Sequence, residues 1–278
     1  MSSPEKPATP QEELRQIVHD LDQRIAALGK AASPITSKRQ LQAAEDSART
    51  LLKRLQALDP IQLPDSVFDP ADPRLFGTFA ALAMVGQDRQ PLDGLDARPF
   101  YGAGIYAIYY KGDFPLYGAI SGTETPLYVG KADPAKAGEN SPKGQGTQLH
   151  GRLVEHMKNI RRAENIDIAD FQCRYLVVAS GWQSAAESAL IGLFNPIWNK
   201  ETRILLGFGK HGDSAETRVN KRSPWDTLHP GREWAKETKE DQKSLAEIEA
   251  AVEQHFIKKP PVAHAEQVLH DLIVRIRS

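Results

Sequence analysis

The sequence has almost no cysteine, since Cys173 is the single one among 278 residues. One thiol has no partner for a disulfide and cannot form a cysteine-based zinc site, which indicates a protein of a reducing compartment. Cys173 lies in the apolar run 171–179. This position predicts a buried strand residue.

Long hydrophobic runs and a strong net charge are also missing. No apolar run approaches the roughly 20 residues that cross a bilayer, and residues 1–12 are polar and contain prolines, unlike a secretion signal. We therefore expect a cytoplasmic protein. The formal net charge of −1 excludes a uniformly basic surface, although a local basic face is sufficient to bind nucleic acid.

Two amphipathic helices are predicted near the N-terminus. Thr9 to Glu12 combine an N-cap residue, a proline at the first helical position and a capping-box glutamate, and apolar residues follow at helical spacing. A second helix begins near Ser37 and ends before Asp59. The resulting hairpin, residues 9–58, either packs on its own core, contacts a second subunit or clasps DNA.

The remaining pattern predicts an α+β fold. The expected elements are helices at 75–85, 148–162, 183–194, 243–257 and 263–276 and strands at 105–110, 126–130 and 172–179. Between residues 104 and 200 their order is β, β, α, β, α. We expect a small mixed or antiparallel β-sheet flanked by helices, and predict parts at 1–60 (helical extension), 61–236 (core with recognition loops) and 237–278 (C-terminal helices).

The predicted helix 183–194 contains one unusual residue. Glu187 is the only charged residue between Arg174 and Lys200, and its helix is apolar or small nearly all round. A carboxylate in such a helix costs several kcal/mol unless a cation or hydrogen-bond donors compensate it. The pattern is typical either of a buried ion pair or of a carboxylate that holds Mg²⁺.

Other polar side chains accompany the predicted core. Arg152 and His156 have i, i+4 spacing beside the apolar stripe of their helix, where an arginine can bind phosphate and a histidine can move a proton. Ordinary packing beside the core is the alternative for both. Tyr106 and Tyr128 lie between apolar neighbours in the hairpin, and taken alone they are typical packing residues.

Together these residues resemble the GIY-YIG endonuclease superfamily. The sequence has Gly104-Ile105-Tyr106, Tyr128-Val129-Gly130, then Arg152 with His156, Glu187 and Asn199 in the order and spacing of that superfamily. The resemblance covers about residues 100–200. Val129 stands where the superfamily has isoleucine, which conserves volume in a strand. The fold that this implies is a GIY-YIG nuclease core.

The resemblance also implies a role for each side chain in phosphodiester hydrolysis. Tyr106 is the general base or activates the water, with His156 assisting proton transfer. Tyr128 contacts the scissile phosphate or the water, and Arg152 stabilises the pentavalent phosphate. A tyrosine with an unperturbed pKa near 10 is a poor base at neutral pH. A nearby cation or His156 must therefore lower that pKa or accept the proton.

Three further residues complete the implied site. Glu187 is the sole protein ligand of one divalent metal ion, Mg²⁺ or Mn²⁺, and Asn199 orients neighbouring groups. Lys131, beside the second motif, is a candidate for contact with phosphate or for tuning a tyrosine.

Two later sequence segments resemble one branch of the superfamily in particular. Gly207 to His211 and Ser223 to Arg232 resemble the small type II restriction branch of the superfamily, whose characterised members cut CCGCGG. This branch implies a palindromic target in double-stranded DNA, a homodimer and a companion DNA methyltransferase. The candidate DNA-binding residues, which include basic residues of the aperiodic stretch 200–236, are Lys131, Arg203, Lys210, Arg218, Lys221, Arg222 and Arg232.

Competing functions remain at this level. A structure-specific repair or recombination nuclease would have the same active site, and a catalytically idle DNA-binding regulator could share the fold. The complete set of polar residues argues against the idle regulator. A P-loop ATPase is excluded, because Thr125 and Ala132 stand where that motif needs glycine and serine or threonine.

Overall fold

The computed structural model describes residues 9–29, 38–58, 61, 73–209, 221–236, 238 and 240–277. The chain divides into two compact units, Met1–Asp65 and Ser66–Ser278. A bilayer-spanning segment is absent from the described helices, because none combines the necessary length with sufficient apolar character.

The first unit contains the two predicted N-terminal helices, α1 (Pro10–Gly29) and α2 (Lys38–Gln56). The expected capping box is formed: the Thr9 backbone N–H donates to Glu12 Oε2 at 2.8 Å, and the Glu12 N–H donates to Thr9 Oγ1 at 3.3 Å. The apolar side chains of both helices are exposed, as in Ile17 at 64% and Leu52 at 55%. Among the described residues, this hairpin therefore has no buried apolar core of its own.

A four-stranded antiparallel sheet forms the centre of the second unit. Its order is β1 (Gln90–Pro91), β4 (Phe171–Val177), β2 (Gly104–Tyr110) and β3 (Tyr128–Ala132). The predicted hairpin is confirmed as β2 and β3. The sequence did not predict β1, which is a two-residue edge strand. Cys173 is fully buried in β4, as expected.

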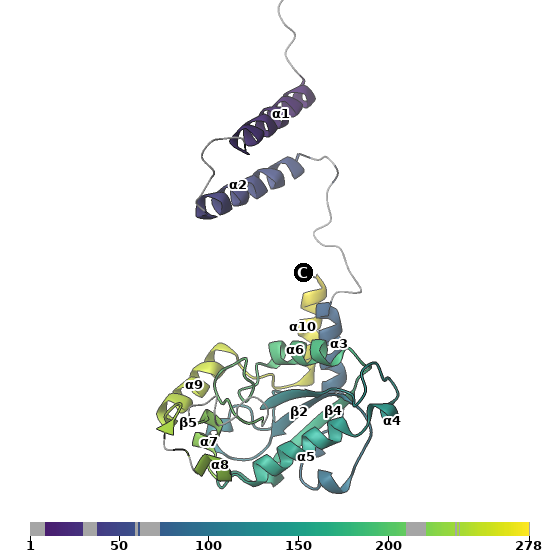
Figure 1. The fold of residues 1–278 in the computed structure, drawn as a ribbon, viewed down its shortest axis with the longest axis vertical. Helices are drawn as coiled ribbons and strands as arrows, with labels where there is room; N and C mark the ends of the chain where they lie inside the picture. The colour runs from purple at the N-terminus through teal and green to yellow at the C-terminus, as the bar shows by residue number, and fades with distance from the viewer. Residues whose placement is uncertain are drawn as a thin grey trace, which may run out of the picture. The chain divides into compact units, whose positions relative to one another are not determined.

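Helices cover both faces of the sheet (Figure 1). One face packs against α5 (Gln148–Arg161), whose predicted stripe Leu149, Leu153, Met157 and Ile160 is fully buried. The other face packs against α3 (Pro73–Val85), α6 (Gln183–Phe194) and α10 (Ala265–Arg277). Consequently every residue of β2 is buried, and successive side chains of this strand enter different cores.

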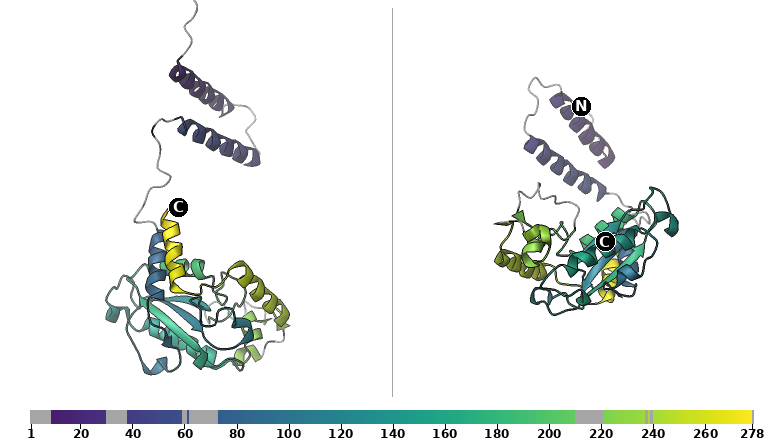
Figure 2. Two further views of the ribbon diagram at one scale, coloured as in Figure 1. Left: turned by 180° about the vertical axis from the view of Figure 1, so that it is seen from behind. Right: turned by 60° about the horizontal axis from the view of Figure 1, so that its bottom comes forward.

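The described part of the second unit contains further elements, most of them short. They are α4 (Pro142–Gln145), β5 (Lys221–Arg222), α7 (Pro224–Leu228), α8 (Glu233–Lys236), β6 (Glu240–Asp241), α9 (Leu245–Lys258) and the 3-10 turns Leu95–Ala97, Pro115–Tyr117 and Ile168–Asp170. α7 and α9 lie at one side of the sheet, as both views in Figure 2 show in green and yellow-green. Their buried residues Trp225, Ile248 and Val252 extend the core on the α5 face.

Candidate active site

Tyr106 and Tyr128 reach the α5 face of the sheet from neighbouring strands. Tyr106 is fully buried, and the two ring centroids are 6.1 Å apart. Tyr106 pairs with Gly130 across the hairpin, and a Cβ atom at position 130 would overlap the Tyr106 hydroxyl group. The glycine of the second tripeptide therefore provides the space that this hydroxyl group occupies.

His156 meets the tyrosines from α5. Its Nε2 atom lies 2.7 Å from the Tyr106 hydroxyl oxygen, in a buried hydrogen bond. The imidazole centroid is 5.4 Å from the Tyr106 ring and 5.0 Å from the Tyr128 ring. Three side chains that are far apart in the sequence thus form one aromatic cluster with a direct path for a proton.

Burial controls the protonation of this cluster. It raises the pKa of Tyr106 well above its usual range, against the opposing effect of the Arg152 charge. Burial, followed by the Arg152 charge, lowers the pKa of His156 to about 3. At neutral pH the pair is therefore a protonated phenol beside a neutral imidazole. Tyr106 can donate its proton to Nε2.

Arg152 lies one helical turn before His156 and is one quarter exposed. Its Nη1 atom donates to Glu155 Oε2 at 2.7 Å. The guanidinium group also interacts with the Tyr106 hydroxyl group. Within the described part of the chain, Glu155 is its only ion-pair partner, and donors that these two contacts do not use can bind an anion. The arrangement suits a residue that contacts phosphate.

Glu187 lies at a cavity of about 670 Å³, which Tyr128, Asn199 and Glu201 also line. Burial raises the pKa of Glu187, partly offset by the Lys131 charge. In residues 73–209 and the later described segments, no basic side chain forms an ion pair with Glu187. Lys131 instead pairs with Asp133 at 2.5 Å. These observations disfavour the structural ion pair expected as the alternative.

The Glu187 carboxylate fits a hydrated divalent cation. It is a half-buried oxygen donor whose charge Lys131 offsets only in part, and it lines a cavity with room for retained water. A site with three or more acidic, histidine or cysteine ligands does not occur among the described residues. One carboxylate plus water and a phosphate is a common mode of binding Mg²⁺.

Asn199 holds the edge of the hairpin. Its Oδ1 atom accepts from the Val129 N–H at 2.9 Å, and its Nδ2 atom donates to the Val129 carbonyl oxygen at 2.8 Å. Val129 lies between Tyr128 and Gly130. Asn199 therefore fixes the backbone that carries one tyrosine and leaves space for the other.

The sequence model of the family described as the Eco29kI GIY-YIG domain matches residues 98–256, more than half of the chain. The chain belongs to this family. It therefore carries an Eco29kI-type GIY-YIG restriction endonuclease domain, which implies nuclease activity on DNA, and Eco29kI itself cuts CCGCGG. No curated protein sequence matches the chain.

The candidate DNA-binding residues of this Eco29kI-type domain have different environments. Arg203 is exposed, with a left-handed backbone at φ 56°. Lys221 pairs with Glu240 at 3.1 Å, and Arg222 pairs with Asp241 at 3.5 Å. Two further candidates, Lys210 and Arg218, lie outside the described residues.

Arg232 differs from the expectation that it binds DNA. Its side chain is 4% exposed, and its guanidinium group binds both carboxylate oxygens of Asp226 at 2.5 and 2.8 Å. A guanidinium group enclosed in this way has no surface for DNA. The role that its position supports is structural, because it joins two segments of the Eco29kI-type domain.

Phe208 is a site residue that the sequence did not reveal. Its ring stacks on His156, with centroids 4.6 Å apart and an interplanar angle of 17°. It also meets the Tyr128 ring edge-on at 5.2 Å. In the sequence, Phe208 stands out only as a member of the run Gly207 to His211. No local pattern connects a phenylalanine in an aperiodic stretch to a histidine 52 positions earlier.

Proposed function

We propose that the protein is a type II restriction endonuclease that hydrolyses double-stranded DNA at a short palindromic, GC-rich site resembling CCGCGG. It would use one Mg²⁺ or Mn²⁺ ion and act as a cytoplasmic homodimer beside a companion methyltransferase. The observation that carries the proposal is the buried Tyr106–His156 hydrogen bond, next to Tyr128, which itself lines the cavity with Glu187.

The first chemical requirement is removal of a proton from the attacking water. Tyr106 accepts this proton as its own proton moves to His156 Nε2, 2.7 Å away. The neutral imidazole is available for this transfer, because burial holds the pKa of His156 at about 3. An incoming phosphate near Arg152 offsets the positive charge that lowers this pKa, and so makes His156 a stronger acceptor during the reaction.

The second requirement is stabilisation of negative charge on the phosphate. The partly exposed Arg152 guanidinium supplies hydrogen-bond donors for the pentavalent phosphate, with Glu155 fixing one of its nitrogens at 2.7 Å. A divalent cation held by Glu187 would supply Lewis-acid stabilisation of the leaving oxygen. Tyr128, which lines the same cavity as Glu187, would contact the phosphate or the water, while Asn199 keeps the strand of Tyr128 in place.

Digestion of a plasmid of known sequence with Mg²⁺, followed by mapping of the new ends, tests the proposal. We expect discrete fragments whose ends share one palindrome, and no cleavage with a chelator. The Glu187→Gln protein, purified in parallel, controls for a contaminating nuclease. Absence of metal-dependent cleavage on DNA that contains CCGCGG and all other short GC-rich palindromes would contradict the proposed function.

A structure-specific nuclease is the main alternative. A panel of plain, nicked and branched duplexes separates the two functions. A restriction enzyme cuts the plain duplex at its site, whereas a repair nuclease prefers the nicked or branched forms regardless of sequence. Binding without cleavage of any substrate would indicate an idle DNA-binding protein.

A further inference from the structure

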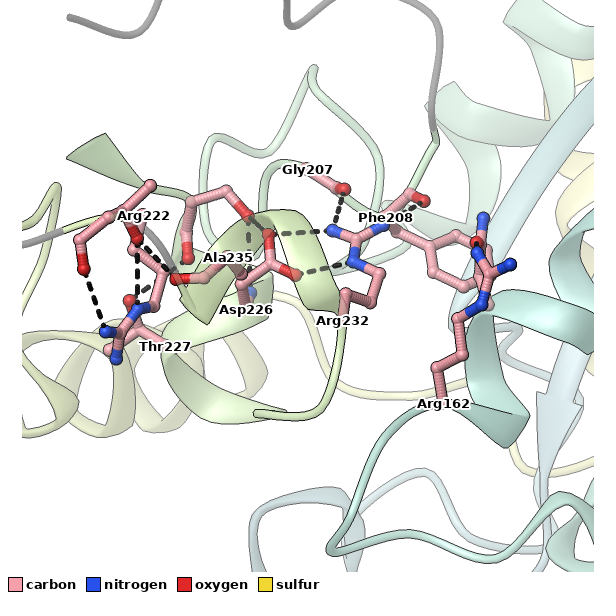
Figure 3. Close-up of polar contacts among 11 residues, drawn as sticks. Arg162, Gly207, Phe208, Arg222, Asp226, Thr227, Arg232 and Ala235 are labelled. Carbon is pink, nitrogen blue, oxygen red and sulfur yellow. Dashed lines mark hydrogen bonds and ion pairs between the residues drawn. The ribbon is translucent and has the colours of Figure 1, made fainter. Parts of the chain in front are cut away.

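The segment that carries Phe208 is anchored at successive residues. The Leu205 N–H donates to the Ile197 carbonyl at 3.1 Å, and the Leu206 carbonyl accepts from the Trp225 N–H at 3.0 Å. Arg232 then donates from Nη2 to the Gly207 carbonyl at 2.6 Å and from Nη1 to the Phe208 carbonyl at 3.3 Å (Figure 3). The backbone leading to the Phe208 ring is thus held from α7 and Arg232.

Arg232 is itself fixed by a buried ion pair. Both oxygens of Asp226 accept from its guanidinium group, and Asp226 is fully buried. A desolvated pair is tolerated only when the remaining donors and acceptors are satisfied. The carbonyl oxygens of residues 207 and 208 meet this need for Arg232, and the Ser223 hydroxyl group meets it for Asp226.

Gly207 allows this close packing. Its φ is 106°, in the region that favours glycine, and a Cβ atom there would overlap the Ser223 side chain, which caps α7. The cap, the ion pair and the Phe208 backbone therefore form one connected unit, which we call the Arg232 clamp: Gly207, Phe208, Ser223, Asp226 and Arg232.

The Phe208 ring covers one face of the His156 imidazole. Phe208 and His156 are both fully buried. The charged or titratable groups that face His156 are Tyr106 from β2, Tyr128 from β3 and Arg152 from its own helix. The segment 205–209 contributes no charge to this face. Its contact is the apolar ring, which excludes water and limits rotation of the imidazole.

We propose that Phe208 is a positioning residue that holds His156 in line with Tyr106, and that the Arg232 clamp sets the place of Phe208. This inference rests on the proposed nuclease function. A small displacement of a proton-transfer pair is costly, since a misplacement of about 1 Å can reduce a rate about 10²-fold.

The test compares Phe208→Leu with Phe171→Leu. Phe171 is also a buried phenylalanine that contacts Trp198, but it has no ring contact with His156. The two variants should therefore lose similar thermal stability. We expect Phe208→Leu to reduce the single-turnover cleavage rate by about tenfold to a hundredfold with DNA affinity unchanged. Phe171→Leu should cleave at nearly the wild-type rate.

The pH dependence provides a readout that lost stability alone would not change. Without Phe208, water reaches His156, so its pKa moves up from about 3 toward the usual value. Neutral imidazole is the proton acceptor, so the acid limb of the rate profile moves to higher pH. We expect this shift for Phe208→Leu and not for Phe171→Leu. Equal rates and equal profiles for the two variants would overturn the inference.

NMR of the His156 ring separates this inference from the proposed function. In DNA-free protein at about pH 6, we expect a neutral ring in the wild type and in Phe171→Leu, and a measurable protonated fraction in Phe208→Leu. If the His156 ring of Phe208→Leu stays as neutral as in the wild type, the positioning role is overturned, even if the variant cleaves DNA. If the wild-type protein does not cleave DNA, only the proposed nuclease function is contradicted. Should the leucine variants not fold, the more adaptable methionine replaces leucine at both positions.

Discussion

Replacement of Glu187 by glutamine separates a metal ligand from a structural ion pair. The change keeps the shape of the side chain and removes its charge. If Glu187 holds the cation, several kcal/mol of transition-state stabilisation are lost. Since each 1.36 kcal/mol is a factor of ten in rate, we expect cleavage to fall by about 10³-fold or more.

The effect of this substitution on folding has the opposite sign from that of breaking an ion pair. Burial raises the pKa of Glu187 in the folded state, so its contribution to stability is greatest below the unfolded-state pKa and decreases as pH rises through the folded-state pKa. At neutral pH the ionised carboxylate therefore disfavours folding. We expect the metal-free Glu187→Gln protein to melt at the wild-type temperature or slightly above it.

DNA binding supplies a third measurement. Without metal, a carboxylate about 5 Å from a phosphate repels it by roughly 1 kcal/mol in a solvated site, so the glutamine variant should bind DNA at least as tightly as the wild type. Glu201→Gln is the matched control, because Glu201 is an exposed carboxylate at the same cavity. It should retain cleavage within several-fold. A large fall in melting temperature with parallel loss of DNA binding would refute the metal-ligand assignment.

Three other changes test the Tyr106 hydroxyl group and the N-terminal helices. Tyr106→Phe should lower single-turnover cleavage by about 10²-fold while the protein stays folded by circular dichroism; near-normal cleavage would remove this hydroxyl group from the mechanism. Gly130→Ala should reduce cleavage to the level of Tyr106→Phe, because its Cβ atom overlaps the Tyr106 hydroxyl group, and a fully active alanine variant would contradict the described hairpin. Sedimentation should show a dimer on cognate DNA, and a truncation that starts at residue 66, the first of the second compact unit, should lower dimer formation; full activity of this truncation would exclude a role for the N-terminal helices in assembly.

Much of the second unit could be predicted from periodicity. The stripe Leu149 to Ile160 specifies a helix with one buried face, and this face is fully buried in the structure. The two-residue strand β1 could not be predicted in this way. It has too few residues for an alternating pattern, and Pro91 disfavours a strand except at an edge or a strand end.

Local sequence patterns predict less of the candidate site than of the fold. The isolated charge of Glu187 is visible in one segment. The contact between Tyr106 and His156 joins residues 50 positions apart, and only the family resemblance predicts it. Arg232 illustrates the opposite difficulty. In an aperiodic, basic stretch it resembles a surface residue, whereas Asp226 and two backbone carbonyls enclose it. Tertiary hydrogen bonds, which leave no periodic signal, decide such cases.

The Asn199 carboxamide has a consequence for self-association of the protein. An outer strand such as β3 normally offers unpaired backbone groups that another chain can extend into a continuous sheet. Here the Asn199 side chain occupies both groups of Val129 in the manner of a peptide unit, and the Trp198 N–H takes the neighbouring Leu127 carbonyl at 2.9 Å. Residues 127–129 therefore have an edge that is already paired, so sheet extension from one protomer into another is blocked beside the cavity.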